Sequence, residues 1–292
     1  MAEVVVGVIG GSGLYDIDGI QNLEEIHMDT PFGAPSDAFI TGTLEGVRCV
    51  FVPRHGRGHR FLPTEVPYRA NIWGLKKLGA RHVISVSAVG SLREDIEPGH
   101  LVCPDQLLDR TRLRANTFFG EGLVAHVQFG NPMEEHLRKV LVESARAATD
   151  KTVHSGGTYV CIEGPTFSTR AESEQFRSWG CSVVGMTNLP EARLAREAEL
   201  AYATLALSTD YDCWHQGHDE VSVESVLAVI KANVAAARAV VRETCLRLGA
   251  LGQVEWPAHK ALAGGIMTAP HLIPKATREK LDLLVGRYLE AL

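Results

Sequence analysis

Short apolar runs alternate along this chain with segments of helical periodicity, and this alternation restricts the fold more than any other feature of the sequence. The runs at 4–9, 82–89 and 158–162 have the length and apolar character of buried strands, and each is followed by glycine or a polar residue. A hairpin is indicated early, where the runs 38–43 and 47–52 flank Leu-Glu-Gly. The pattern predicts an α/β fold with a mixed central β-sheet flanked by helices.

Helices are predicted where apolar residues recur every three or four positions. The predicted helices are 68–78, 133–148, 171–179, a segment beginning at Pro190, a long stripe from Val223 to Val241, and 275–289.

Composition supports an ordinary globular protein that acts on a small molecule. The 292 residues carry a net charge of −6, so no basic surface favours nucleic acid or an anionic membrane. No apolar run approaches the ~20 residues of a membrane-spanning helix. The six cysteines are scattered without a C-x-x-C pair, which indicates reduced thiols and a cytoplasmic protein. We expect one domain over 1–292, in which 251–292 forms an arm and a last helix.

Two loops have the composition of anion sites. In GVIGGSGLYD (7–16) a strand enters a glycine-rich turn, whose backbone N–H groups and Ser12 hydroxyl can hold an anion; a dinucleotide turn and a plain tight turn remain alternatives. In VPRHGRGHRFLP (52–63), Arg54 and His55 follow a strand, where α/β proteins place their sites. Arginine suits phosphate, and a solvated basic loop is the alternative.

Several strand ends carry further polar or small residues. Asp210 and Asp212 follow an apolar run two residues apart, so strand alternation predicts that both carboxylates point the same way and require a donor-rich partner. Ser87 and Ala88 end another strand and leave room for a ligand. Glu163 is expected to be a helix cap or a buried salt-bridge partner. Met186 is by default a core residue.

These motifs together resemble one family. GGSG, RHGRGH, NIWGLK, SAVGSLRE, IEGPTFSTRAES, MTNLPEARLARE and TDYDCW occur in the order seen in 5′-methylthioadenosine phosphorylases, which are trimeric nucleoside phosphorylases. The resemblance spans about 4–226, and the tail beyond 250 matches loosely. The family turn usually carries threonine where this chain has Ser12, which keeps the hydroxyl.

The resemblance implies phosphorolysis of methylthioadenosine to adenine and 5-methylthioribose 1-phosphate, with inorganic phosphate as co-substrate, no cofactor and no metal. The positions that match phosphate-binding residues are Ser12, Arg54, His55, Ser87, Ala88 and Thr187. Those that match nucleoside-binding residues are Phe167, Ser168, Met186, Asp210, Asp212, Val223 and Leu272, together with His126 acting from a neighbouring subunit. A homotrimer or a dimer of trimers is therefore expected.

The chemistry of the reaction agrees with these roles. Bound phosphate stabilises the positive charge that builds on the sugar, and it supplies the nucleophile. Asp210 would deliver or share the N7 proton of the purine, because burial and Asp212 raise its pKa. Asp212 would accept a hydrogen bond from the 6-amino group.

Three other functions remain to be weighed. A 6-oxopurine nucleoside phosphorylase of the same fold would need a donor such as asparagine where this chain has aspartates. An NAD-dependent oxidoreductase would use the 7–13 turn. A metal hydrolase would use Asp210, Asp212, His215 and His218, although a solvated loop is the simpler interpretation of the last two.

Overall fold

The computed structural model describes residues 3–11, 13–14, 17–215 and 223–289. Its sheet contains eleven strands in the described ranges. The strands are β1 (Val5–Gly10), β2 (Gln21–Ile26), β3 (Phe39–Leu44), β4 (Val47–Pro53), β5 (His82–Ser91), β6 (Leu101–Cys103), β7 (Gln106–Arg110), β8 (Val153–Ser155), β9 (Thr158–Ile162), β10 (Cys181–Gly185) and β11 (Ala201–Asp210). The helices are α1 (Tyr68–Lys77), α2 (Glu135–Ala148), α3 (Arg170–Ser178), α4 (Asn188–Glu197), α5 (Val223–Leu251) and α6 (Lys275–Leu289), with short 3-10 turns at Pro257–Lys260 and Pro270–Leu272.

Strand β5 is the centre of the sheet. It pairs in parallel with β1 and with β11, and near its end it pairs antiparallel with β10. The main path runs β2-β3-β4-β1-β5-β10-β9-β7, while β11 and β6 lead away from it. Since β4, β1, β5 and β11 run in the same direction, their carboxyl ends lie at one edge, where α/β folds bind ligands.

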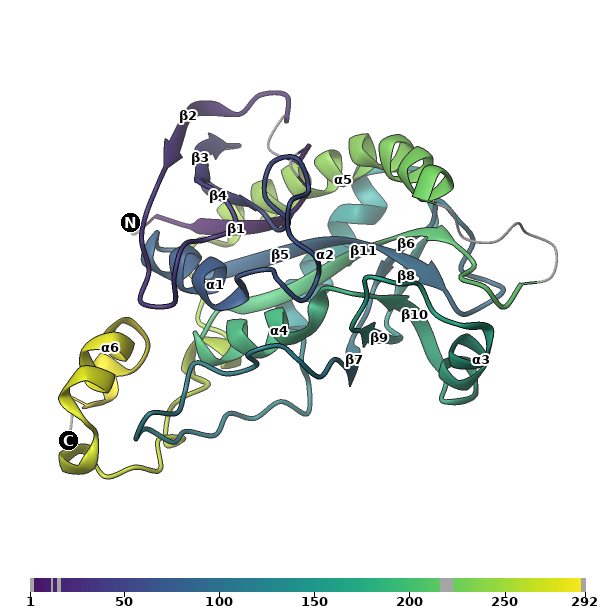
Figure 1. The fold of residues 1–292 in the computed structure, drawn as a ribbon. Helices are drawn as coiled ribbons and strands as arrows, with labels where there is room; N and C mark the ends of the chain where they lie inside the picture. Colours follow the sequence, from purple (N-terminus) through teal and green to yellow (C-terminus); the bar gives the residue numbers. More distant parts are fainter. Residues whose placement is uncertain (1–2, 12, 15–16, 216–222, 290–292) are drawn as a thin grey trace.

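Helices cover both faces of this sheet (Figure 1). Val6 and Val8 of β1 pack in one apolar cluster with α2 and α5, whereas Val5 and Ile9 pack in the other with α1, α4 and α6. A strand with both faces buried cannot alternate polar and apolar residues, which explains the continuous apolar runs in the sequence. The predicted mixed sheet flanked by helices is confirmed.

Predicted and observed elements agree where hydrophobic burial determines the position of the element in the sequence. The hairpin is confirmed as the antiparallel pair β3 and β4, and the predicted bounds of β9 and α6 match. Strands β2, β6, β7 and β8 were not predicted. The side chains of β2 are mostly exposed and show no apolar pattern, β7 is partly exposed, and β6 and β8 have only three residues each. No helix in the described ranges combines the length and the apolarity that crossing a membrane requires.

The amino end of β5 packs against the segment that follows α5. His82 is 2% exposed, and its ring lies 4.8 Å from that of Trp256 and 5.4 Å from that of His259. The Nδ1 atom of His259 accepts a hydrogen bond from the Trp256 backbone at 3.0 Å. Burial lowers the pKa of His82 to about 3 and that of His259 to about 4, so both rings are neutral at pH 7.

This cluster predicts a loss of stability in acid. An unfolded histidine has a pKa of about 6.5, so between pH 6.5 and the folded pKa values the unfolded chain binds more protons. The contribution of the two rings is complete above pH 6.5, and each loses up to about 1.4 kcal/mol per pH unit below it. Urea titrations from pH 7 to 4 should show a smaller slope of unfolding free energy against pH for His82→Gln. The same change at exposed His27 should leave the slope unaltered, and equal slopes for all three proteins would contradict the prediction.

Candidate active site

Arg54, directly after β4, is buried at the carboxyl edge of the sheet. Its Nε and Nη2 atoms donate to the two carboxylate oxygens of Glu191 at 2.7 and 3.0 Å. Nη2 also donates to Ser85 Oγ at 2.7 Å, and Nη1 donates to the Val86 carbonyl at 3.0 Å. These bonds occupy four of the five guanidinium N–H groups, which leaves one on Nη1 for a ligand.

Glu191 was missed by the sequence interpretation, which saw only a helix segment there. Its carboxylate is 1% exposed and also accepts hydrogen bonds from Ser85 Oγ at 2.6 Å and from the Tyr202 hydroxyl at 2.8 Å. The negative charge balances that of Arg54 inside the protein. Arg54 therefore brings an oriented donor to the site, rather than an uncompensated positive charge.

Two hydroxyls lie without partners beside this ion pair. Ser87 on β5 and Thr187 at the start of α4 are each 7% exposed, and neither side-chain oxygen has a hydrogen-bond partner among the described residues. Both lie near the phenol of Tyr159: burial raises the pKa of Tyr159 to about 12, and the two hydroxyls act in the opposite direction. Buried hydroxyls without partners are costly, so a pair of them facing a common region indicates an oxygen-rich ligand.

His55, next to Arg54, is neutral at pH 7. Burial, and then the charge of Arg54, lower its pKa to about 4. Its Nδ1 lies 2.9 Å from the Phe61 carbonyl, so this nitrogen carries the proton and Nε2 is left as an acceptor. Ala88, which follows Ser87 on β5, is half-buried at the same edge.

The two aspartates lie together, although for a different reason from the predicted one. Strand β11 ends at Asp210, and Asp212 lies beyond it with a φ of 49°, so strand alternation does not align them. Instead Asp210 Oδ1 accepts a hydrogen bond from the Asp212 backbone at 2.8 Å. A Cβ atom at Gly90 of β5 would lie 2.8 Å from Asp210 Oδ1 and 3.3 Å from Asp212 Cβ, so a side chain there would displace the Asp210 carboxylate.

Both carboxyls are harder to ionise than usual. Burial raises the pKa of Asp210, while hydrogen bonds from Thr209 and from the Asp212 backbone oppose the rise. Burial raises the pKa of Asp212 to about 6, and the charge of Asp210 adds to the effect. The pair can therefore exchange a proton with a base near neutral pH.

Glu163 is a salt-bridge partner, which settles the alternative left open by the sequence. Its carboxylate lies 3.1 Å from Nε of Arg114, a buried residue that the sequence interpretation missed. Arg114 also donates to the carbonyls of Glu163 at 2.8 Å, Met186 at 2.7 Å and Leu189 at 2.6 Å. One guanidinium thus holds the end of β9 against the junction of β10 and α4.

The structure places the other nucleoside candidates near this junction. A Cβ atom at Gly164 would lie 2.6 Å from Met186 Sδ, which links the turn after β9 to Met186. Phe167, farther along this turn, is 43% exposed. Ser168 is joined to the aspartates, since Cys213 Sγ lies 3.3 Å from its carbonyl.

His126 and Leu272 belong to a different part of the chain, in which segment 124–126 pairs with segment 265–267 of the C-terminal arm. We call these two paired segments the ribbon. The His126 backbone donates to the Gly265 carbonyl at 2.9 Å, and Met267 donates to Val124 at 2.8 Å. Leu272 follows on the same C-terminal arm and is 66% exposed. The arm and α6 lie at the opposite side of the molecule from α3 (Figure 1).

Some candidates lie outside the described residues, namely Ser12, His218 and the side chain of Val223. His215, the partner of His218 in the metal interpretation, lies 3.0 Å from Glu94. Within the described part of the chain, no group of three His, Cys, Asp or Glu side chains is placed to hold a metal ion.

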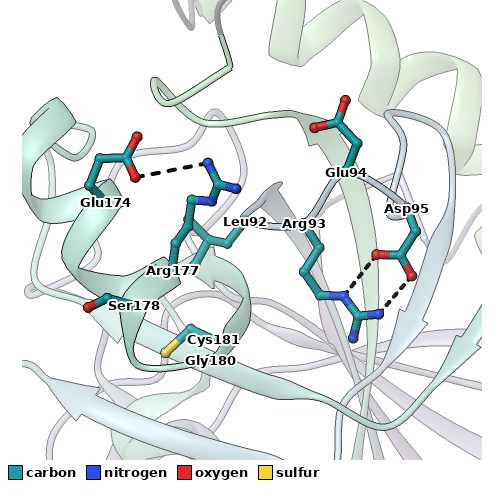
Figure 2. A pocket seen from close by; sticks show the side chains of 9 residues that line it. All are labelled: Leu92, Arg93, Glu94, Asp95, Glu174, Arg177, Ser178, Gly180 and Cys181. Atoms are coloured by element: carbon teal, nitrogen blue, oxygen red, sulfur yellow. Dashed lines mark hydrogen bonds and ion pairs between the residues drawn. The ribbon is translucent and has the colours of Figure 1, made fainter.

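A hollow of about 620 Å³ beside α3 contains none of the predicted site residues (Figure 2). Its lining charges pair with one another or with neighbours: Arg93 with Asp95, Arg177 with Glu174, and Glu94 with His215. Its lining residues are Leu92, Arg93, Glu94, Asp95, Glu174, Arg177, Ser178, Gly180 and Cys181. The hollow is therefore distinct from the Arg54 and Asp212 region.

The fold and the polar strand ends define a member of the phosphorylase superfamily. The sequence model of that superfamily matches residues 5–245, and the chain belongs to it. It is 58% identical to an S-methyl-5′-thioadenosine phosphorylase of Geobacter sulfurreducens over 98% of this chain and all of that protein. It is 55% identical to one of Synechocystis over 99% of this chain and 89% of that protein.

Solved structures give the same result. A methylthioadenosine phosphorylase from an antarctic soil metagenomic library has a TM-score of 0.92 and 44% identity, with 97% of this chain and 99% of that chain covered. The Schistosoma mansoni methylthioadenosine phosphorylase in complex with adenine has a TM-score of 0.80 and 36% identity, with 97% and 98% covered. These matches do not favour the oxidoreductase, metal hydrolase or 6-oxopurine alternatives.

The buried ion pair predicts unequal effects of single and double substitutions. Arg54→Met should destabilise the protein by about 3–5 kcal/mol, because it leaves the Glu191 carboxylate buried without its counter-charge. Adding Glu191→Leu should recover part of that loss, since no charge then remains buried. Urea unfolding at pH 7 measures both. A double variant less stable than Arg54→Met would show that the charges do not depend on each other.

Proposed function

We propose that this chain catalyses phosphorolysis of 5′-methylthioadenosine, giving adenine and 5-methylthioribose 1-phosphate. The observation that carries the proposal is the pair of buried hydroxyls, Ser87 and Thr187, without partners beside the oriented Arg54 guanidinium. The names of the relatives, at 58% and 55% identity over nearly the whole chain, support the same reaction.

In this proposal the phosphate is held mainly by neutral donors. Ser12, Ser87 and Thr187 supply hydroxyls, Ala88 lies beside the bound phosphate, and Arg54 supplies its remaining N–H. The neutral His55 accepts a hydrogen bond from a protonated phosphate oxygen. Preorganised donors of this kind stabilise an oxyanion without carrying a net charge into the site. The bound phosphate attacks C1′ of the ribose as the bond to the purine breaks.

The purine lies, in the same proposal, between Phe167 and the two aspartates. Asp210 delivers or shares the N7 proton, and Asp212 accepts from the 6-amino group. Ser168 and Val223 shape the base pocket, and Met186 lies against the ribose. A 6-oxopurine would place its oxygen against a carboxylate, which is repulsive unless that carboxylate is protonated.

The whole chain, 1–292, acts as one nucleoside phosphorylase domain in this proposal, with the arm and helix of 251–292 as part of it. The enzyme uses inorganic phosphate as a co-substrate and no cofactor. Its described cysteines are all free thiols, which is typical of proteins that act in the cytoplasm.

Adenine release should depend on phosphate. Purified protein incubated with methylthioadenosine should yield adenine and a sugar 1-phosphate in phosphate buffer, and neither in phosphate-free buffer. Methylthioinosine should react roughly five- to 150-fold more slowly in kcat/KM, since an unpaired buried polar group costs about 1–3 kcal/mol. Chromatography of both products measures the outcome. Equal release without phosphate, with free methylthioribose as the product, would identify a hydrolase instead.

We also propose a homotrimer, alone or as a dimer of trimers, in which the ribbon of His126 completes a neighbouring subunit's site. His126 and Leu272 are both exposed, and the backbone bonds between the two strands of the ribbon hold them on one projecting element. The C-terminal arm lies on the opposite side of the molecule from α3 in Figure 1, and Cys213, next to Asp212, contacts Ser168 beside α3. This arrangement supports contact of the arm with another copy rather than with its own chain's aspartates.

Light scattering should give a mass near three times 31.7 kDa, or twice that. His126→Ala should raise the KM for methylthioadenosine about tenfold, as for a lost polar contact, while the KM for phosphate and the melting temperature stay unchanged. A fully active monomer would rule out the neighbouring-subunit role.

A further inference from the structure

Asp212 is buried, and its carboxylate has few close hydrogen-bond partners among the described residues. It is 7% exposed, and its carboxylate has a single hydrogen-bond contact within the described residues, the Cys213 thiol at 4.0 Å from Oδ2. Its backbone φ of 49° is uncommon for a residue other than glycine, and such strain concentrates at functional sites. A buried carboxylate with so weak a partner requires further donors to stay ionised.

Two hydroxyls beside Asp212 lack acceptors. Ser173 is 0% exposed, and neither its oxygen nor that of Ser168 has a partner within hydrogen-bond distance among the described residues. Both hydroxyls nevertheless lower the pKa of the Asp212 carboxyl in the manner of hydrogen-bond donors. The bond from Cys213 Sγ to the Ser168 carbonyl, at 3.3 Å, holds the two segments together.

Helix α3 fixes the position of Ser173. Thr169 caps the helix by accepting from the Glu172 backbone at 3.2 Å, and Glu172 Oε2 accepts in return from the Thr169 backbone at 2.8 Å. The Ser173 backbone then donates to the Thr169 carbonyl at 2.9 Å. A capping box of this kind orders the first turn, so the hydroxyl is presented from a rigid element.

We infer that Ser173 is a positioning residue for Asp212: its hydroxyl, assisted by that of Ser168, donates to the carboxylate, keeps it ionised and directs it at the 6-amino group of the purine. This inference rests on the proposed function. It extends the base-reading site to α3, a helix that the sequence interpretation connected only with the motif around Phe167.

The neighbours of Asp212 shift its pKa in the directions that the inference requires. Burial raises its pKa to about 6, the hydroxyl of Ser173 opposes that rise most strongly, and the charge of Asp210 adds to it. The other titratable neighbour is the Cys213 thiol, on which Arg170 of α3 also acts. Without Ser173 the carboxyl would hold its proton at higher pH, and a protonated carboxyl accepts poorly from an amine.

Ser173→Ala tests the inference through the pH dependence of kcat/KM for methylthioadenosine, which reports ionisations of the free enzyme. The wild type should lose activity as the pH falls through about 6, where Asp212 becomes protonated. In the variant this acidic limb should move to higher pH by about half a unit or more, which is a roughly threefold lower kcat/KM at pH 5 relative to the plateau.

Ser208→Ala is the matched control. Ser208 on β11 is also 0% exposed and also has no hydrogen-bond partner among the described residues, but it is not among the groups with the largest effects on the pKa of Asp212. The limb of this variant should coincide with that of the wild type. In an Asp212→Asn background, Ser173→Ala should no longer shift the limb, because the titrating group is gone.

The outcomes separate the inference from the function on which it rests. The inference is overturned if Ser173→Ala leaves the acidic limb of the kcat/KM profile in place. It is also overturned if Ser173→Ala moves that limb equally in the Asp212→Asn background. If the wild type shows no phosphate-dependent release of adenine at any pH, the proposed function fails. The inference is then decided by the pH dependence of adenine binding, measured by calorimetry. Adenine affinity that is lost at a higher pH in Ser173→Ala than in the wild type supports the inference. No adenine binding, or the same pH dependence in both proteins, overturns it.

Discussion

The buried ion pair of Arg54 and Glu191 connects the parts of this protein that form its candidate site. Through it the end of β4 is joined to α4, and the shared contacts of Glu191 with Ser85 and Tyr202 add β5 and β11. Two charges removed from water need close geometry and further hydrogen bonds to be tolerated, and this pair has both. The pair thus fixes β4, β5, β11 and α4 relative to one another before any ligand binds.

Helix α4 carries this arrangement to distant parts of the molecule. Its first turns bear Glu191 and follow Thr187, while Arg196 near its end donates to the carbonyls of Gln128 and Asn131 at 2.9 and 2.7 Å. Those carbonyls belong to the long connection that contains His126. One helix therefore positions the candidate phosphate site and also the ribbon that we propose to reach a neighbouring subunit.

Some polar groups of the site have hydrogen-bond partners among the described residues, and others do not. Arg54, Glu191 and Arg114 are almost fully hydrogen-bonded inside the protein, and they act as the rigid frame. The hydroxyls of Ser87, Thr187 and Ser173 have no hydrogen-bond partner in the part of the chain that the structure describes. Proteins tolerate such local deficits mainly at functional sites, because the ligand completes the hydrogen bonds.

The sequence by itself determined the buried central strands and the helices, because burial on both faces of β1 and β5 demands apolar runs that are visible in one dimension. It also indicated Arg54 and the two aspartates, since charged residues directly after buried strands stand out. The exposed strand β2 has no such pattern and could not be predicted. Glu191, Arg114 and Ser173 could not be recognised as site components either, because the groups that they adjoin, Arg54, Glu163 and Asp212, lie far from them in sequence. Only tertiary structure brings them to the strand ends, and only there do burial and missing partners give them a function. The pairing of Asp210 with Asp212 likewise depends on a left-handed backbone turn against Gly90, which a period-two strand pattern does not contain.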